Sequence, residues 1–402
     1  MDAYHAPQAG ISLGSLAPPD VDAGAAADPP RSCLLDSKPF FGEGTNATTA
    51  RYHTTDPDDR HRAMAIQTTL FVARPPRVSY VLAWATGTYF TGEPLVLSAD
   101  GGLVLLTIAV RMKLWPFPEY YIYQPGGGAC AAPSLYLIPQ PNGTRLVNEI
   151  CAVGLLSHGG GGGYHVAALA LPENGEFELF VFSSETRSWT VKKPVLSSQA
   201  DEAADFGYYT PDKAIVIGGG GAMAFVDVWD GILFCNNVLD GGEHPELHYL
   251  RLPSADLPGR APTTGRNLVT SHSTCRATQS ASGSSRWSVP PPPRKDCVLY
   301  DSELSVADGV GIDGLLQPDA LEVDDEPSFG HLFVDMPMLS LHESKVVCFL
   351  AKHHLSDSEV WAVAVDMETK RITGVNLLQV GRCTRLFYST ISSHLIMHDC
   401  SS

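Results

Sequence analysis

The sequence predicts an all-β protein, and three of its features carry that prediction. From Arg31 onward the chain is a series of short apolar runs, such as "RVSYVLAW" and "SLYLIPQP", which are cut by Gly, Pro, Asp and Asn. No segment of a dozen residues shows a helical period of apolar residues, and one pattern of strands and turns occurs twice. Many short strands with frequent turn residues indicate a sandwich, a barrel or a propeller.

The first 30 residues differ from the rest in composition. They are rich in Ala, Gly, Pro and Asp and contain no Lys or Arg before Arg31. Such a segment buries too little apolar surface to become ordered, and it lacks the basic and apolar stretches of a targeting signal. We predict a disordered tail over residues 1–30 and a single domain over residues 31–402.

The stretch "AFVDVWDGILFC" predicts a β-hairpin. Asp230-Gly231 stands there between two apolar runs, which is typical of a two-residue turn with positive φ. Both runs are apolar at nearly every position, so we expect strands that are buried on both faces. Because stacked propeller blades bury their inner strands in this way, a β-propeller-like fold is favoured over the alternative, paired β-sandwiches.

A longer pattern occurs twice. The stretches "HVAALALPENGEFELFVFSSETRSW" and "VCFLAKHHLSDSEVWAVAVDMETKRI" both read as strand, polar loop and strand ending in Glu-Thr. Thr186 and Thr369 lie 183 residues apart. This is the offset of four repeats of about 46 residues, and propeller blades are roughly 40–50 residues long. We therefore expect about six or seven blades.

Residues 254–296 break this pattern. The stretch is rich in Ser, Thr and Pro and shows no clear strand pair. We predict a long exposed loop here, and whether one blade is incomplete stays open. Its run "VPPPPRK" (Val289–Lys295) is typical of a stiff spacer, with a polyproline ligand for an aromatic groove as the alternative.

The charge balance limits the partners that this chain can have. It contains 27 basic and 44 acidic residues, for a formal net charge of −17. This excess repels phosphate backbones and anionic lipid, so we expect no nucleic acid and no membrane as partner. The longest apolar run, Leu103–Val110, is too short to span a bilayer. We expect a cytoplasmic or nuclear protein that is neither secreted nor membrane-spanning.

The nine cysteines are spread along the chain without a CxxC pair. Neither a zinc ribbon nor a thioredoxin-like motif is therefore present. Cys235 and Cys348 stand in apolar runs, where a cysteine is usually a small core residue. We expect reduced thiols.

Two glycine runs raise the question of a phosphate site. They are "SHGGGGGYHVAALAL" (Ser157–Leu171) and "IGGGGAM" (Ile217–Met223). A phosphate loop needs the pattern GxxxxGK[ST], and a dinucleotide fingerprint needs a helix after the glycines. Neither run meets these requirements, so we interpret both as connectors and expect no cofactor.

Several polar residues are candidates for catalysis or metal binding, and each has a simpler interpretation. Adjacent histidines on a strand point to opposite faces and cannot share a metal, and aspartates at strand ends are ordinary turn residues. The motifs HExxH and GxSxG are absent. We predict no catalytic, cofactor-binding or metal-ligating residue. The candidates interpreted in this way are His158, His165, Ser183, Ser184, Asp227, Asp230, His342, Glu343, His353, His354, Asp357 and Asp366.

Nine stretches carry a resemblance to a known family. In chain order they are "LLDSKPFFGEGTNATTA", "ARPPRVSYV", "VGLLSHG", "LFVFSSETRSW", "FVDVWDGILFC", "LHYLRLP", "PMLSLHESKVVCFLAK", "WAVAVDMETKRITGV" and "STISSHL". They resemble the domain-of-unknown-function 1618 family, which is expanded in grasses. The resemblance implies an uncharacterised plant protein, similar in style to the propeller-like domains beside F-boxes, and offers no established catalytic residue. After Pro253 the chain departs from the family, whose members continue into a strand-rich stretch.

These observations favour a non-catalytic protein–protein interaction platform, because a propeller exposes loops on a rigid body. The partner is an unknown protein, and a basic surface on it would suit the acidic chain. The alternative is an enzyme whose carboxylates or histidines gather in the central channel of the propeller.

Overall fold

The computed structural model describes most of the chain between residues 29 and 395. The described residues are 18, 29–55, 61, 63–111, 118–126, 132–141, 150–158, 163–170, 176–197, 209, 211, 213–217, 221–227, 231–239, 242–251, 267–270, 297–300, 303–312, 314–316, 329, 332–343, 345–354, 357, 359–378 and 385–395. The chain forms two compact units. We call Met1–Arg74, Val78–Ala255 and Gln379–Ser402 the first unit, and Pro75–Arg77 and Asp256–Leu378 the second unit.

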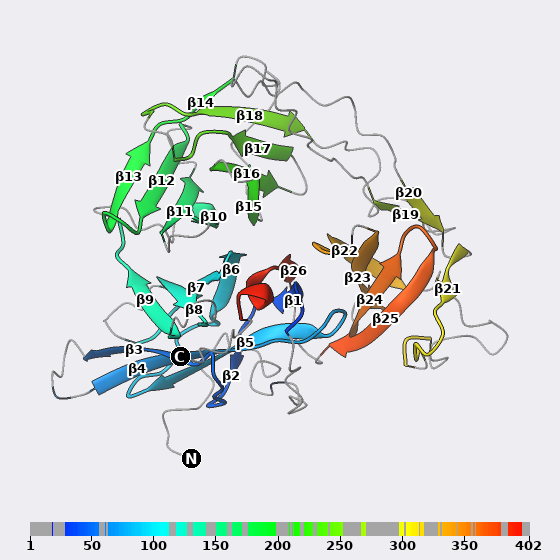
Figure 1. Cartoon of the computed structure of the whole chain (residues 1–402). Helices are drawn as coiled ribbons and strands as arrows, with labels where there is room; N and C mark the ends of the chain where they lie inside the picture. The colour runs from blue at the N-terminus through cyan, green and yellow to red at the C-terminus, as the bar shows by residue number, and fades with distance from the viewer. Residues whose placement is uncertain are drawn as a thin grey trace, which may run out of the picture. The chain divides into compact units, whose positions relative to one another are not determined.

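The first unit is built from four sheets (Figure 1). Its strands are β1 (Cys33–Asp36), β2 (Phe40–Phe41), β3 (Ala50–Thr55), β4 (Ala63–Phe71), β5 (Val78–Thr86), β6 (Leu95–Asp100), β7 (Leu103–Ile108), β8 (Glu119–Gln124), β9 (Ser134–Ile138), β10 (Ile150–Ser157), β11 (Tyr164–Ala170), β12 (Glu178–Ser183), β13 (Ser188–Lys192), β14 (Val195–Leu196), β15 (Lys213–Ile217), β16 (Ala222–Asp227), β17 (Gly231–Cys235), β18 (Glu246–Arg251) and β26 (Leu386–Ser389). The first sheet has the order β26-β1-β5-β4-β3, with β2 beside β5. The others are β6 to β9, β10 to β13, and β15 to β18 with β14 beside β18.

The second unit contains a two-stranded and a five-stranded sheet. Its strands are β19 (Asn267–Thr270), β20 (Cys297–Tyr300), β21 (Ser305–Val306), β22 (Phe333–Leu339), β23 (Val346–Lys352), β24 (Val360–Asp366) and β25 (Arg371–Leu378). β19 pairs with β20, and the larger sheet has the order β21-β25-β24-β23-β22.

This topology confirms the prediction of an all-β, propeller-like fold. Four of the sheets contain an antiparallel meander of four strands that follow one another in the chain, which is the topology of a propeller blade. In the remaining large sheet β26, from the end of the chain, pairs with β1, and Cys33 is in register with Ser389. The described ranges hold no α-helix, and their helical segment is the 3-10 turn η5 (Ile391–Leu395).

Within the first unit, strands β7 and β11 are buried on both faces. The first strands of successive sheets, β6, β10 and β15, lie side by side (Figure 1). Leu106 on β7 belongs to the core shared with the first sheet, whereas its neighbour Leu105 belongs to the core shared with β10–β13. Val166 and Ala167 on β11 likewise face two different cores. Such strands are therefore apolar at nearly every position rather than at every second one.

The hairpin between β16 and β17 corrects one prediction. Asp227 and Gly231 are register partners, so the connection consists of residues 228–230, outside the described residues, and Asp230-Gly231 is not a two-residue turn. Gly231 begins β17 without a positive φ. β16 is buried at nearly every position, but β17 alternates between buried and half-buried residues. Crowding explains the glycine, because an added Cβ would lie 2.5 Å from Tyr249 Cε2 and 2.7 Å from the Leu250 carbonyl oxygen.

The repeated sequence pattern forms the same structure twice. Its copies form β11 with β12 and β23 with β24, each the second and third strand of a sheet. In each copy the residue after Glu-Thr has positive φ: 53° at Arg187 and 55° at Lys370. In the described residues, β15–β18 and β19–β20 stand between the copies. Among the described residues the two copies are therefore three sheets apart, and residues 252–266 and 271–296, which lie between them, are outside the described residues.

Two predicted segments fall mainly outside the described residues. Of the predicted tail only residues 18, 29 and 30 are described, and of residues 254–296 only β19. β19 pairs antiparallel with β20, so this stretch contains one strand where the sequence indicated a loop. The single domain over residues 31–402 stays a prediction.

Three cysteines whose burial the structure describes are core residues. Cys33, Cys235 and Cys348 are free and buried, as the apolar runs around the latter two predicted. Burial raises the pKa of the Cys235 thiol to about 11. A thiol that keeps its proton is a poor nucleophile, so Cys235 packs rather than reacts.

Candidate functional site

An aromatic surface lies at the outer ends of two neighbouring sheets of the first unit. We use this term for Tyr136, Tyr164, Arg187 and Trp189. Tyr136 lies on β9 and Trp189 on β13, each the fourth strand of its sheet. The Tyr136 residue is 50% exposed, Tyr164 and Trp189 are half-buried, and Arg187 is exposed.

The register of the strands determines on which face of the sheet these side chains lie. Directly opposite residues of an antiparallel pair share a face of the sheet. Tyr136 is opposite Ile122, and Trp189 is opposite Phe182. Ile122 and Phe182 belong to the core between sheets β6–β9 and β10–β13. Tyr136 and Trp189 therefore continue this core to the edge of both sheets, where it meets solvent.

Trp189 ties the two sheets together at this edge. Its indole N–H donates to the carbonyl oxygen of Pro139, which follows β9, over 2.6 Å. Its ring packs against Phe182, with the ring centroids 5.4 Å apart. The bond and the ring contact hold Trp189 in one orientation, so this part of the surface is preformed.

Tyr164 and Arg187 complete the surface at the turn after β12. The Tyr164 N–H donates to Ser184 Oγ over 2.8 Å, and the Ser184 N–H donates to the Tyr164 carbonyl oxygen over 3.0 Å. The Tyr164 ring lies 6.3 Å from that of Phe182. Burial raises the pKa of the Tyr164 phenol, and the Arg187 charge lowers it in part. Arg187 thus supplies a cation beside the rings.

The composition of the aromatic surface is typical of a protein-binding site. Tyr, Trp and Arg are enriched at protein interfaces and among their hot spots. Aromatic rings offer a large apolar area together with a polar group that stays near solvent. The surface can therefore bury apolar area and pair a carboxylate in the same contact.

Two of the candidate histidines meet next to this surface. His158 Nε2 and His165 Nδ1 lie 2.7 Å apart, and the ring centroids are 4.8 Å apart. Burial and the neighbouring His158 lower the pKa of His165. One ring therefore donates an N–H to a neutral partner ring. In the part of the chain that the structure describes, no three His, Cys, Asp or Glu side chains gather to hold a metal.

The first glycine run closes an ordinary hairpin. The His158 N–H donates to the Gly163 carbonyl oxygen over 2.9 Å, and Ser157 is in register with Tyr164. A strand, β11, follows the run instead of a helix. The run is therefore a connector between antiparallel strands, as predicted. Residues 159–162 and 218–220 lie outside the described residues.

Other candidate residues stabilise turns. Asp366 Oδ1 accepts the N–H groups of Glu368 over 2.9 Å and Thr369 over 3.0 Å, and these bonds lower the pKa of its carboxyl. Asp357 Oδ2 accepts the N–H of His354 over 2.7 Å. These contacts are those of ordinary turn residues.

The remaining candidates are spread over the fold. Ser340 Oγ accepts the N–H groups of His342 and Glu343 over 3.4 and 3.1 Å. Ser183 is in register with Ser188, and Asp227 is a buried strand residue. His353 follows the end of β23, and Asp230 and Val289–Lys295 lie outside the described residues.

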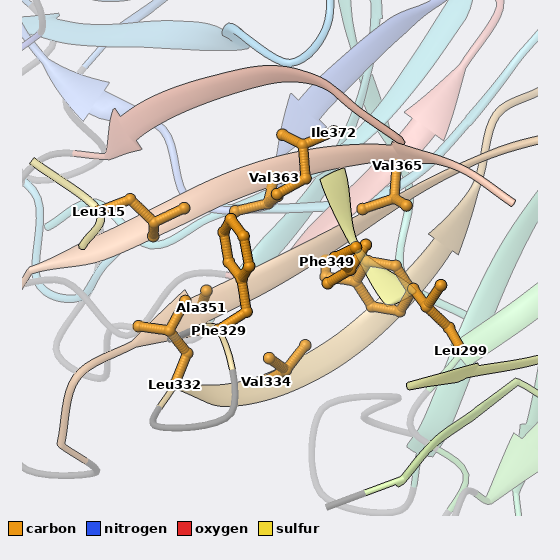
Figure 2. Close-up of a pocket in the computed structure, with 11 residues that line it drawn as sticks. Leu299, Leu315, Phe329, Leu332, Val334, Phe349, Ala351, Val363, Val365 and Ile372 are labelled. Atoms are coloured by element: carbon orange, nitrogen blue, oxygen red, sulfur yellow. The ribbon is translucent and has the colours of Figure 1, made fainter. Parts of the chain in front are cut away.

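A small cavity lies inside the second unit (Figure 2). It has a volume of about 40 Å³. A cavity needs about 10–15 Å³ to hold one water molecule, and small-molecule pockets are on the order of 300–1,000 Å³. The cavity is therefore a packing void. Its lining is wholly apolar: Leu299, Leu304, Leu315, Phe329, Leu332, Val334, Phe349, Ala351, Val363, Val365 and Ile372.

The aromatic surface could not be predicted from the sequence, and the reason is physical. Trp189 lies on β13. Its companion Tyr136 belongs to another sheet, and the two strands are far apart in the chain. An aromatic residue on the predicted fourth strand of each of two consecutive sheets is the signal that could have found it.

Comparison with known proteins adds little to this description. No family model matches the chain, and no curated protein matches it. Among solved structures, the chain is similar to the Myceliophteria thermophila Cps50 (Swd1) β-propeller domain, with 8% identity, a TM-score of 0.21, and coverage of 86% of this chain and 89% of that one. The fold assignment above therefore rests on sheet topology. Within the described residues, no helix is long and apolar enough to cross a membrane.

Proposed function

We propose that this protein is a non-catalytic platform that binds another protein through the aromatic surface. The observation that carries the proposal is the pair Tyr136 and Trp189. They extend the core of two sheets to the solvent, and Trp189 is held there by its bond to Pro139. A preformed aromatic edge loses little conformational freedom on binding, so its contact area contributes efficiently to affinity.

The charge of the chain favours one kind of partner. A net charge of −17 attracts a partner whose surface is basic, and this long-range attraction raises the association rate. Salt screens it, so binding should weaken as ionic strength rises. The resemblance to a plant family of unknown function makes grass leaf tissue the place to look for the partner.

The test is capture of a partner that depends on the aromatic surface. Tagged full-length protein, Tyr136→Ser and the matched control Ile215→Ser would be compared by proximity labelling and then by binding of the purified partner. The control is suitable because Ile215 is 47% exposed, close to the 50% of Tyr136. We expect the Tyr136 variant alone to lose the partner.

The alternative, an enzyme, is tested on the same preparation. It would be screened with nucleotide, ester, phosphate and glycoside substrates. Turnover that disappears when one carboxylate or histidine is changed would overturn the platform proposal. Equal binding of the partner by both variants would overturn the role of the aromatic surface.

A further inference from the structure

In two sheets of this protein an extended segment pairs in parallel with the outer edge of the fourth strand. β14 lies beside β18, and β21 lies beside β25 (Figure 1). The N–H groups of Val195 and Ser197 donate to carbonyl oxygens at the start of β18, over 2.9 and 2.8 Å. Those of Ser305 and Ala307 donate to carbonyl oxygens beside the start of β25, over 3.1 and 2.9 Å.

β13 is the counterpart of β25. Both strands follow the turn that carries Glu-Thr, and the pairs Ser183–Ser188 and Asp366–Arg371 are in register at the start of the fourth strand. The acceptors at the edge of β25 are the carbonyl oxygens of Lys370 and Ile372. The matching carbonyl oxygens at the edge of β13 are those of Arg187, in the turn before the strand, and of Trp189. No segment among the described residues pairs with this edge of β13.

We propose that an extended segment of a partner protein pairs in parallel with the outer edge of β13. Two of its N–H groups donate to the carbonyl oxygens of Arg187 and Trp189, and the chain lies across the aromatic surface. The inference rests on the proposed function, and it names the form that the partner takes there. Addition of a strand to an open sheet edge is a common way to recognise an extended peptide.

The segment β21 shows which residue types the partner segment needs in order to pair with β13. Glu303 pairs with Lys370 at 2.5 Å beside the turn. Val306 is in register with Ile372. Arg187 takes the place of Lys370 on β13, and among the described residues it has no carboxylate in an ion pair. The occupant should therefore carry an acidic residue opposite Arg187.

The same register also shows where the partner segment needs an apolar residue. Trp189 stands in the place of Ile372, and Val191, two residues further on the same face, is 53% exposed. Register neighbours in a sheet share a face, so an apolar residue in the place of Val306 would pack against Trp189. The expected pattern is an acidic residue followed, three residues later, by a β-branched or other apolar residue.

The probe is a fluorescent peptide with the sequence of β21 and its flanks, Glu-Leu-Ser-Val-Ala-Asp, added to the full-length protein. N-methylation of the peptide Ser or Ala removes an N–H that points to the edge, and should weaken binding about tenfold, the effect of one lost hydrogen bond. N-methylation of the peptide Val is the matched control, because its N–H points away. Equal effects of the three methyl groups would overturn parallel pairing.

A charge exchange locates the binding edge. Arg187→Glu should weaken binding of the peptide, and a peptide with Lys in place of Glu should restore it. Lys370→Glu is the matched control, because β21 already covers that edge. If Lys370→Glu weakens binding and Arg187→Glu does not, the peptide displaces β21 and the proposal is wrong.

Two further outcomes would overturn the inference without touching the proposed function. Slow hydrogen exchange of the Trp189 amide in the protein alone would mean that another part of this chain covers the edge. A partner that requires Tyr136 but is indifferent to Arg187→Glu and to competition by the peptide would mean that the surface binds without strand addition.

Discussion

Arg187 and Lys370 have the same left-handed backbone conformation, with φ of 53° and 55°, although they lie in different sheets. Each follows a Glu-Thr pair and precedes the fourth strand of its sheet. Such a φ is unusual for a residue with a side chain. Its occurrence at two matching places shows that one turn is used twice, and that a long basic side chain is placed beside the edge of the fourth strand both times.

Substitution of Arg187 should show the strain in this turn. Arg187→Val places a β-branched residue at positive φ and should lower the free energy of unfolding by about 1–2 kcal/mol. Arg187→Gly should leave it unchanged within about 1 kcal/mol, because relief of strain offsets the larger entropy of the unfolded chain. Urea unfolding followed by tryptophan fluorescence measures both. Equal stability of the two variants would mean that the turn changes conformation freely.

Gly231→Val should destabilise the protein by about 1–3 kcal/mol, the usual cost of overpacking. The reason is the approach of Tyr249 and Leu250 to the Cβ position. Gly231→Asn distinguishes this from a turn requirement, since Asn tolerates positive φ but cannot avoid the contact. We expect both variants to have a lower thermal midpoint than the control Gly242→Val, whose Cβ would meet nothing within 4 Å. A stable Asn variant would contradict the crowding account.

Tyr209→Phe should lower the free energy of unfolding by about 1–3 kcal/mol, the cost of leaving buried polar groups without partners. The buried Tyr209 hydroxyl donates to the Phe225 carbonyl oxygen over 2.5 Å and accepts the Leu233 N–H over 3.2 Å. It thereby joins β16 to β17. Tyr136→Phe, at an exposed position, is the matched control and should have no effect on the urea midpoint. Similar midpoints for the two variants would show that water replaces the hydroxyl.

The protein should lose stability in alkali. Burial raises the pKa of Tyr120 to about 12, and it also raises those of Tyr121 and Tyr123. In the unfolded chain these phenols ionise near pH 10. Between about pH 10 and 12 the unfolded state therefore binds fewer protons than the folded state, and the stability that is fully present below pH 10 is lost as pH rises.

The measurement for this prediction is the thermal midpoint as a function of pH, with tyrosinate absorbance to follow ionisation. Tyr120→Phe should reduce the loss of midpoint above pH 10, because one of the three phenols no longer has to be kept protonated. A midpoint that stays constant from pH 9 to about 12 would contradict the burial of these hydroxyls.

The sequence by itself determined the features that depend on neighbours in the chain. Short runs that are apolar at nearly every position, such as the one that forms β16, predicted strands buried on both faces, because a period of two or its absence is a local property. The repeated Glu-Thr turn could be predicted from the sequence for the same reason. The structural role of Gly231 could not be predicted in this way. Glycine serves equally for positive φ and for close approach of the backbone, and the atoms that crowd Gly231 come from β18.

Only the tertiary structure decided which residues meet across sheets. The register of β8 with β9 and of β12 with β13 brings Tyr136 and Trp189 to one edge, and sheet packing allows the indole to reach Pro139. The outer edge of β13, with which no described segment pairs, has no sequence signature, since it is defined by what pairs elsewhere. Contacts of this kind depend on how separate sheets stack and pair, and short-range patterns carry no information about that arrangement.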